Sequence, residues 1–394
     1  MHDPVVIVGA ARTPIGAFQG AMKEIPAPSL GAWAIEAAVA QSGVPVAQID
    51  ECVMGCVLTA GLGQAPARQA ALGGGLSETT ACVTVNKMCG SGMKAVMDAH
   101  DRLRADASGV IVAGGMESMS NAPYLLDRAR GGYRLGHGRV IDHMFQDGLE
   151  DAYERGRLMG DFAEECAQAY QFTREMQDEF ALTSLQRAQR ATRNGDFAAE
   201  IVPVKVKSGK DERLASADEL PLKANAGAIP KLRPAFREDG TLTAANSSAI
   251  SDGAAGLVLA TLSKAEAFGS QPLARIVGHV THAGAPAKFP TAPIAAIRKL
   301  MDRIGWALGD VDLFEINEAF AVVAMAAERD LSLPHDKVNI HGGACALGHP
   351  IGASGARILV TLLFALARYG LKRGVASLCI GGGEATAIAI ERLR

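Results

Sequence analysis

The feature that most constrains how this 394-residue chain can fold is an internal duplication. Its first copy begins with an apolar run at residues 50–57 and a second short run at 81–85. A glycine-rich turn at 86–92 and a helical stretch follow, and the copy ends in an apolar run at 109–117 that closes with glycines and a glutamate. Short, wholly apolar runs between helical stretches are typical of strands buried on both faces of a sheet.

The second copy repeats this order near the C-terminus. Residues 312–320 form its first apolar run, and a glycine-rich turn at 342–355 precedes an apolar helical stretch at 356–367. The copy again ends in an apolar run, 376–384, that closes with glycines and a glutamate. The repeat predicts an α/β protein of two similar halves related by a pseudo-twofold axis. We expect the functional turns to converge where the halves meet.

The segment between the two copies differs from both of them. Residues 121–249 are rich in charged and polar side chains and offer little material for a sheet core. A chain of this length also exceeds one compact core. We therefore expect three units: an N-terminal half of residues 1–120 plus 250–270, an inserted loop domain of residues 121–249, and a C-terminal half of residues 271–394.

Composition excludes several classes of function. Aromatic residues make up only 5% of the chain and the net charge is −3, so the sequence predicts no nucleic-acid partner. The late apolar run at 358–367 is shorter than the roughly twenty residues of a membrane span, so we expect no membrane partner. Seven scattered cysteines, an odd number, do not form a disulfide framework, and we expect a reducing, cytoplasmic environment.

One cysteine stands in a position suited to covalent catalysis. Cys89 lies in the turn NKMCGSG, between a strand-like run and a helix-like run. Glycines permit a sharp turn and a close approach by substrate, as in a nucleophile elbow. The start of a helix would also lower the pKa of the thiol. Taken alone, Cys89 fits a buried structural cysteine better than a nucleophile, since that is the commoner state of a lone cysteine.

Two further segments strengthen the catalytic interpretation. His349 lies in the glycine-rich turn of the second copy, and Cys379 lies in its last apolar run. Taken alone, His349 fits an ordinary turn histidine, and Cys379 fits a buried strand cysteine. All three at corresponding turns of a duplicated fold are much harder to explain by structure alone. Cys52 and Cys56 lack a matching Cys or His pair, so we interpret them as apolar fillers and expect no metal site.

These turns and two further motifs carry a resemblance to a known family. The motifs are residues 86–92, 114–120, 317–320, 348–352 and 379–383. Together they resemble the thiolase family, specifically its acetoacetyl-CoA thiolase branch, over essentially the whole chain. The resemblance implies a duplicated five-layer α-β-α-β-α architecture with an inserted loop domain. It also implies an acyltransferase that cleaves acetoacetyl-CoA with CoA and condenses two acetyl-CoA molecules.

The resemblance also implies roles for individual residues. Cys89 would be the nucleophile that carries the acyl group as a thioester, and His349 would accept its proton. Cys379 would be the second acid and base. Asn317 would hold a water that forms one oxyanion hole with His349, and the backbone N–H groups of Cys89 and Gly381 would form the other. No permanently bound cofactor is implied, since CoA and acetyl-CoA are substrates.

The CoA-binding residues follow from the same resemblance. They are expected at Met159, Ser248, Ala319, Phe320 and, for the phosphates, Lys223. Leu158 stands where biosynthetic members usually carry a histidine, and this departure bears on chain-length preference or CoA affinity. Residues 129–145 match the excursion that this branch uses for assembly, so we expect a homotetramer built as a dimer of dimers.

Two other classes remain as alternatives. A decarboxylating β-ketoacyl synthase shares the duplicated fold but typically pairs its cysteine with two histidines, whereas this chain has Cys379 at the last position. A non-catalytic CoA-binding scaffold would not need two positioned thiols.

Overall fold

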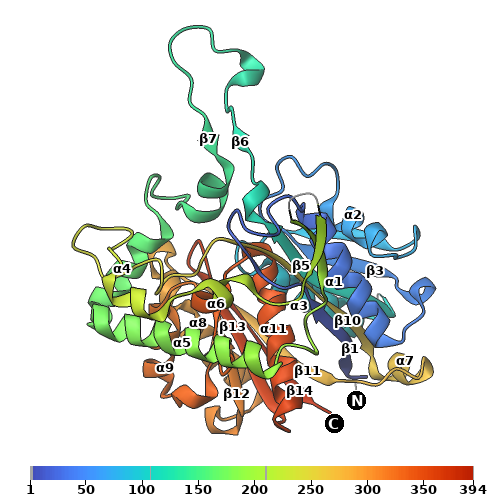
Figure 1. The fold of residues 1–394 in the computed structure, drawn as a ribbon. Helices are drawn as coiled ribbons and strands as arrows, with labels where there is room; N and C mark the ends of the chain where they lie inside the picture. The colour runs from blue at the N-terminus through green and yellow to red at the C-terminus, as the bar shows by residue number, and fades with distance from the viewer. Residues whose placement is uncertain (1–2, 107, 209–210, 394) are drawn as a thin grey trace.

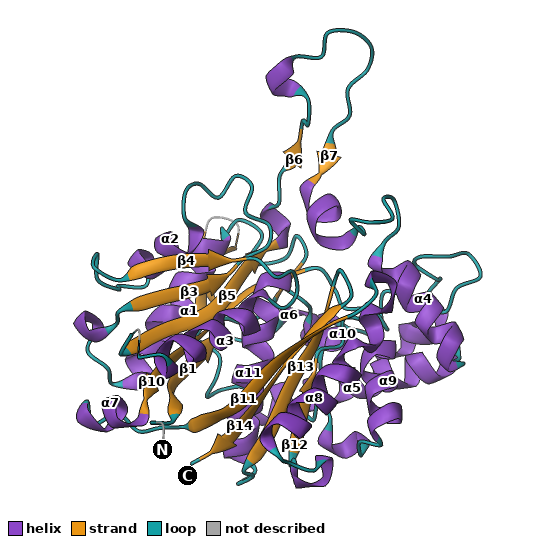
Figure 2. Cartoon of the chain, turned by 180° about the vertical axis from the view of Figure 1, so that it is seen from behind, coloured by secondary structure: helices purple, strands orange, loops and turns teal. Residues whose placement is uncertain are grey.

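Two half-sheets form the centre of the structure, a computed structural model that describes residues 3–106, 108–208 and 211–393. The first half-sheet has the order β4-β3-β5-β10-β1 (Figure 2). Its strands are β1 (Val5–Arg12), β3 (Glu51–Gly55), β4 (Ala81–Val85), β5 (Val110–Ser118) and β10 (Ser251–Thr261). The two-residue strand β2 (Gly16–Ala17) adds to β10. Strand β3 runs parallel to β4 and β5, whereas β10 is antiparallel to β5 and β1.

The second half-sheet has the order β11-β14-β13-β12. Its strands are β11 (Ala274–Ala283), β12 (Leu313–Ile316), β13 (Arg373–Ile380) and β14 (Glu384–Arg392). Strands β12 and β13 are parallel, and β14 is antiparallel to both of its neighbours. A short pairing of Val6 with Arg275 and Ile7 with Ala274 joins β1 to β11, so the two half-sheets are continuous.

The duplication in the sequence reappears as matching elements in the two half-sheets. Strands β1, β3, β5 and β10 correspond in order and direction to β11, β12, β13 and β14. The counterpart of edge strand β4 is reduced to a single parallel bridge between Phe314 and Val338.

Helices cover both faces of each half-sheet. The outer face of the first carries α1 (Ala27–Ser42) and α2 (Pro66–Gly73), and the outer face of the second carries α8 (Ala292–Ile304) and α9 (Ala321–Leu331). Between them lie α3 (Ser91–Arg104) and α11 (Ile351–Arg368) (Figures 1 and 2). The apolar side chains of these two helices join both half-sheets in one core. This order of helix and sheet layers is the predicted five-layer architecture.

The two central helices cross at glycines, and this crossing positions the site. A Cβ on Gly355 would lie 2.4 Å from the backbone nitrogen of Met93. A Cβ on Gly92 would lie 2.9 Å from the nitrogen of Ala356. Only glycine permits so close an approach of two helix backbones. The N-terminal ends of α3 and α11 therefore meet, and with them the turns that carry Cys89 and His349.

Helix α11 is also, among the described residues, the one helix whose length and hydropathy would suit a membrane span. Of its 18-residue window, 83% is buried inside the protein. Its apolar surface is accounted for by packing between the half-sheets.

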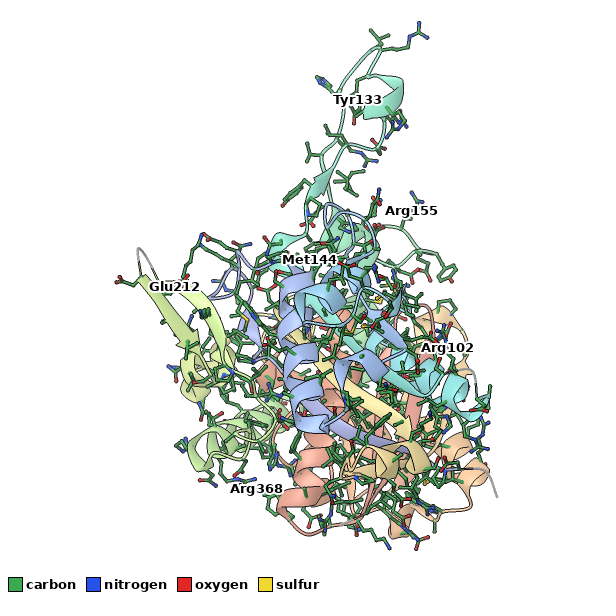
Figure 3. All side chains as sticks on the ribbon, turned by 90° about the vertical axis from the view of Figure 1, so that its right-hand side faces the viewer. Arg102, Tyr133, Met144, Arg155, Glu212 and Arg368 are labelled. Atoms are coloured by element: carbon green, nitrogen blue, oxygen red, sulfur yellow. The ribbon has the colours of Figure 1, made fainter. Side chains whose placement is uncertain are left out.

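The residues between the two copies form a layer over the second half and a projecting arm. The layer contains α4 (Met159–Tyr170) and α5 (Arg174–Asn194), which pack against α9. The arm rises from the short strands β6 (Tyr124–Leu125) and β7 (Ile141–Asp142) at the top of Figure 1. Figure 3 places Tyr133 near the tip of this arm, away from the body of the protein.

A buried ion cluster fastens this intervening region to the first half-sheet. At the end of β1, Arg12 Nε lies 2.6 Å from Glu200 and its Nη1 lies 2.7 Å from Asp218. All three side chains are buried. Removing one partner of such a cluster would leave an uncompensated buried charge, at a cost of about 3–5 kcal/mol.

Candidate active site

One largely apolar pocket of about 290 Å³ collects the predicted reactive groups. Cys89, His349 and Cys379 all line it, although 290 residues separate the first from the last. Gly381 lines it as well. The sequence prediction that the glycine-rich turns converge is therefore met in the geometry of the pocket.

A tight turn presents Cys89 to the pocket. Met88, the residue before it, has a φ of +48°, in the left-handed region that non-glycine residues adopt only at a cost. Ser91 stabilises this turn, because its hydroxyl donates to the Met88 carbonyl at 2.6 Å and accepts from the Lys87 N–H at 2.8 Å. Helix α3 then begins at Ser91, directly after Cys89 and Gly90.

The pKa of Cys89 is raised, whereas the sequence analysis predicted that it would be lowered. The backbone N–H groups of Gly381 and of Cys89 itself face the sulfur and favour the thiolate. Burial of the thiol is the larger effect, and with the nearby Glu117 carboxylate it raises the pKa to about 11. The prediction of a lowered pKa was wrong, because desolvation outweighs the helix terminus. The resting nucleophile is a neutral thiol that needs a base.

The backbone around His349 leaves little freedom for the position of this residue. Gly348 has a φ of +106°, and a Cβ there would lie 2.1 Å from the Ser251 hydroxyl oxygen, so only glycine fits. The N–H of His349 donates to the Ala249 carbonyl at 2.9 Å.

The hydrogen bonds of His349 fix which nitrogen acts as a base. Ser354 Oγ donates to the Pro350 carbonyl at 2.9 Å and lies 2.6 Å from His349 Nδ1. Nδ1 therefore carries the hydrogen and donates it to Ser354. Nε2 is left with its lone pair and has no hydrogen-bond partner among the described residues. Burial, followed by the charge of Arg357, lowers the pKa of His349 to about 3, so the ring is neutral at rest.

Cys379 is the more deeply buried of the two pocket thiols. It is the last residue but one of strand β13, next to the turn that carries Gly381. Burial, and then the proximity of Cys89, raises its pKa well above the usual range. Cys379 is therefore protonated at neutral pH, and its thiolate would be a strong base.

Asn317 lies behind the imidazole rather than on the pocket wall. Its Nδ2 is 3.5 Å from His349 Nδ1, and the side chain is buried. Its Oδ1 has no hydrogen-bond partner within the described part of the chain.

Two backbone pairings between distant segments form the part of the pocket wall where the resemblance to thiolases predicted CoA contacts. Ser247 forms an antiparallel bridge with Phe320, and the N–H of Ser248 donates to the Ala319 carbonyl at 2.9 Å. These pairings bring residues more than 70 positions apart onto one surface. The pocket is lined by Leu158, Met159, Ser248, Ala319 and Phe320.

Lys223 is the one expected contact that lies elsewhere. It ends the short helix α6 (Glu219–Lys223), and its Nζ lies 2.5 Å from Glu219. It does not line the pocket. Lys223 is paired within its own short helix and lies away from the pocket, so the structure gives no geometric reason for a ligand to contact it.

Three residues that the sequence analysis did not single out also shape the site. Ser354 orients His349, and its place one turn into α11 was a signal that could have been used. Phe236 comes from an irregular segment without any motif, and it lines the pocket against Phe320 with ring centroids 5.8 Å apart. Glu117 had appeared only as part of a motif.

Glu117 holds the turns around the pocket together. Its buried carboxylate accepts N–H groups from Val57 at 3.0 Å, Leu58 at 3.1 Å and Gly352 at 2.8 Å. Burial raises its pKa to about 7 despite these bonds. The carboxylate thus ties the loop after β3 to the first turn of α11.

The raised pKa of Cys89 predicts how it reacts with iodoacetamide. The rate of alkylation should increase about tenfold per pH unit from pH 7 towards 10, because the thiolate is the reactive form. Peptide mass spectrometry measures this rate, and acetyl-CoA should protect Cys89. Cys82, whose pKa is lowered by Cys52 and Arg68, lies outside this pocket and should not be protected. A plateau for Cys89 below pH 8 would contradict the burial argument.

The pocket has the groups that acyl transfer through a thioester requires. They are a neutral thiol, a neutral imidazole, a second thiol and convergent backbone N–H groups. Comparison with known proteins identifies the family that carries this set. Residues 5–263 match the thiolase N-terminal domain and residues 270–392 match the thiolase C-terminal domain. This chain belongs to the thiolase family, as the sequence motifs indicated.

Individual relatives agree with this assignment. An acetyl-CoA acetyltransferase of Escherichia coli is 51% identical over 391 residues, covering 98% of this chain and 99% of that protein. One from Pseudomonas aeruginosa is 47% identical and covers 100% of both chains. The crystal structure of the Bacillus anthracis acetyl-CoA acetyltransferase superposes with a TM-score of 0.96 at 42% identity, covering 100% of this chain and 99% of that one. The predicted fold class is confirmed.

Proposed function

We propose that this thiolase is an acetyl-CoA C-acetyltransferase. It cleaves short-chain 3-ketoacyl-CoA, with acetoacetyl-CoA as the reference substrate, and in reverse condenses two acetyl-CoA molecules. The observation that carries the proposal is the meeting of Cys89, His349 and Cys379 on one pocket. The acetyl-CoA acetyltransferases that match nearly the whole chain support the choice of substrate.

In thiolysis, Cys89 attacks the 3-keto carbon of acetoacetyl-CoA while its proton passes to His349 Nε2. The bond between the carbonyl carbon and C2 then breaks, leaving an acetyl thioester on Cys89 and the enolate of acetyl-CoA. Cys379 protonates this enolate, which its raised pKa permits because it is a thiol at neutral pH.

In the second half-reaction, the thiolate of Cys379 takes the proton of an incoming CoA thiol. The CoA sulfur attacks the acetyl thioester, and Cys89 leaves and recovers its proton from His349. Exchange between two thioesters costs little free energy, which suits a reversible enzyme. In condensation, the Cys379 thiolate removes a methyl proton from acetyl-CoA instead.

Oxyanions form in both half-reactions. The N–H groups of Cys89 and Gly381, which face the sulfur at rest, are placed to stabilise one of them. A water held by Asn317, together with His349, would stabilise the other. Each such donor is worth about 2.7–4 kcal/mol in the transition state.

The apolar wall suits the pantetheine arm of CoA. Met159, Ser248, Ala319 and Phe320 are the proposed contacts, and Leu158 offers an apolar side chain instead of an imidazole. Lys223 could meet the CoA phosphates only after leaving Glu219. No permanently bound cofactor is required by this chemistry.

We also infer a homotetramer, assembled as a dimer of dimers. The arm between β6 and β7 leaves large apolar side chains in solvent: Tyr124 is 67% exposed, Leu135 98% and Val140 66%. An arm with this composition is suited to contact other copies of the chain. Both reactive sulfurs must stay reduced, so we place the enzyme in the cytoplasm. Its proposed 3-ketoacyl-CoA substrates place it in fatty acid metabolism.

Adding one methyl group to the pocket wall, by Gly160→Ala, tests whether the substrate binds in this pocket. A Cβ on Gly160 would lie 2.3 Å from the ring of Phe236, so Gly160→Ala should displace that ring into the pocket. We expect KM for acetoacetyl-CoA to rise about tenfold, the size of a modest overpacking cost. Steady-state kinetics measures this, while alkylation of Cys89 by the small iodoacetamide should persist.

The matched control is Gly309→Ala, since a Cβ there meets no atom within 4 Å among the described residues. Its KM should equal that of the parent. An unchanged KM in Gly160→Ala would place substrate binding elsewhere.

The assay of the proposed activity compares three substrates with the purified chain and CoA. Acetoacetyl-CoA should be cleaved most efficiently, as judged by kcat/KM, against 2-methylacetoacetyl-CoA and a longer 3-ketoacyl-CoA. No cleavage of any of the three would overturn the proposal.

A further inference from the structure

A second cluster of reactive side chains lies between the two halves of the molecule, away from the pocket. His100 and Asp101 lie near the end of α3, and His279 lies in β11 of the other half. Both histidines are buried, whereas Asp101 is 60% exposed and opens the cluster to solvent. Arg102, the next residue on α3, is at the surface in Figure 3.

Three atoms of this cluster form a nearly equilateral triangle. His279 Nε2 lies 2.9 Å from Asp101 Oδ1 and 3.1 Å from His100 Nδ1, and His100 Nδ1 lies 3.1 Å from Asp101 Oδ1. Ligand atoms of a tetrahedral zinc ion, at metal distances of about 2.0–2.1 Å, are about 3.3 Å apart. The triangle therefore needs only a slight opening to become one face of such a site.

Hydrogen bonds alone do not satisfy this triangle. If His100 Nδ1 and His279 Nε2 each donate a hydrogen to Asp101, these two nitrogens, both protonated, lie only 3.1 Å apart and repel each other. If one nitrogen is bare, its lone pair faces the carboxylate oxygen. A cation that accepts a lone pair from all three atoms removes the conflict.

Burial first, and then the nearby cations, favour neutral ring nitrogens in this cluster. Burial, despite Asp101, lowers the pKa of His100 to about 4 and also lowers that of His279. The facing charged groups are Arg104 beside His100, and Lys94 and Arg303 beside His279. These cations disfavour a hard ion that binds by charge alone. An ion that bonds covalently to imidazole is better suited.

We propose that His100, Asp101 and His279 bind one divalent transition-metal ion of the zinc class, with solvent as a further ligand. His100 is eleven residues beyond Cys89, about 16 Å along a helix at 1.5 Å per residue. The ion is therefore structural and takes no part in acyl transfer. It joins the central helix of the first half to a strand of the second half.

Sequence spacing gave no indication of this site. The adjacent pair His100 and Asp101 is not a recognised ligand spacing, and 178 residues separate Asp101 from His279. The three side chains meet only because the fold places the last turns of α3 beside His279 of β11.

Titration of the full-length, metal-free protein with Co²⁺ tests the proposal. We expect one Co²⁺ per chain, a visible d–d spectrum of nitrogen and oxygen coordination without thiolate charge transfer, and displacement by Zn²⁺. Asp101→Asn and His279→Gln should each weaken Co²⁺ binding by about tenfold or more. Losing a residue that merely hydrogen-bonds to a metal ligand already costs about that much, and losing the ligand itself should cost at least as much. Zn²⁺ should raise the melting temperature of the parent and not of these variants.

The control is His282→Gln, which alters a histidine of the same strand outside the triangle. It should bind Co²⁺ like the parent. Asp101→Asn changes an exposed side chain and keeps its shape, so it remains informative if His279→Gln fails to fold. Absence of stoichiometric binding by the parent, a thiolate charge-transfer band, or unchanged binding by Asp101→Asn would each overturn the proposal.

Discussion

Replacing Cys89 by serine is expected to lower kcat for acetoacetyl-CoA thiolysis by about 10⁴-fold or more, as for other enzymes that lose their nucleophile. The hydroxyl is a far weaker acid than the thiol, and His349, with a pKa lowered to about 3, is a weak base for it. A serine ester would also not exchange with a CoA thioester at equal free energy. The variant should keep its fold, because the side chains are nearly the same size.

The matched control is Cys82→Ser, in edge strand β4 and outside the pocket. Its kcat should stay within a factor of two of the parent. Near-normal turnover by Cys89→Ser would end the assignment of the nucleophile.

Replacing Cys379 by serine should separate the two half-reactions. Acetylation of Cys89 by acetyl-CoA releases a CoA thiolate, a good leaving group that needs little help from an acid. Condensation requires a base strong enough to remove a methyl proton, and a buried thiolate with a raised pKa supplies one. We expect condensation to slow by about 10²–10⁴-fold, the usual contribution of a positioned base.

Acetylation in the same variant should stay within about tenfold of the parent, since a tenfold change is only about 1.36 kcal/mol of barrier. Rapid quenching with mass spectrometry follows the acetyl-enzyme, and absorbance of acetoacetyl-CoA follows condensation. Equal loss of both steps would contradict a separate role for Cys379.

The meeting of Cys89, His349 and Cys379 could be anticipated because each lies in a glycine-rich turn of a repeated unit or, for Cys379, in the apolar run directly before one. Equivalent turns of two similar halves come to the same edge when the halves pack face to face. The physical reason lies in Gly92 and Gly355, which let α3 and α11 approach closely enough for their first turns to share a pocket.

The ionisation of the site could not be anticipated in the same way. The helix terminus next to Cys89 is visible in the sequence and favours the thiolate. The burial that reverses its effect is not visible there, because the pocket walls come from distant segments around Met159, Phe236 and Phe320. For the same reason, the hydrogen bond that orients His349 through Ser354 emerged only from the structure.

Contacts set by exposed or isolated residues were the least predictable. Lys223 was chosen for its charge, yet its pairing with Glu219 satisfies that charge locally. His100 and His279 belong to no motif, and each alone has the character of an ordinary core histidine. Pairings between distant positions of this kind depend on where the end of α3 comes to lie beside β11 in the folded chain.

Locating the covalent acetyl group tests whether Cys89 is the residue that carries it. The protein is incubated with isotopically labelled acetyl-CoA, quenched in acid, digested and mapped by mass spectrometry. We expect one acetyl group per chain on the peptide that contains Cys89, and its release when CoA is added before the quench. An acetyl group on another residue, or one on Cys89 that CoA does not discharge, would contradict this expectation.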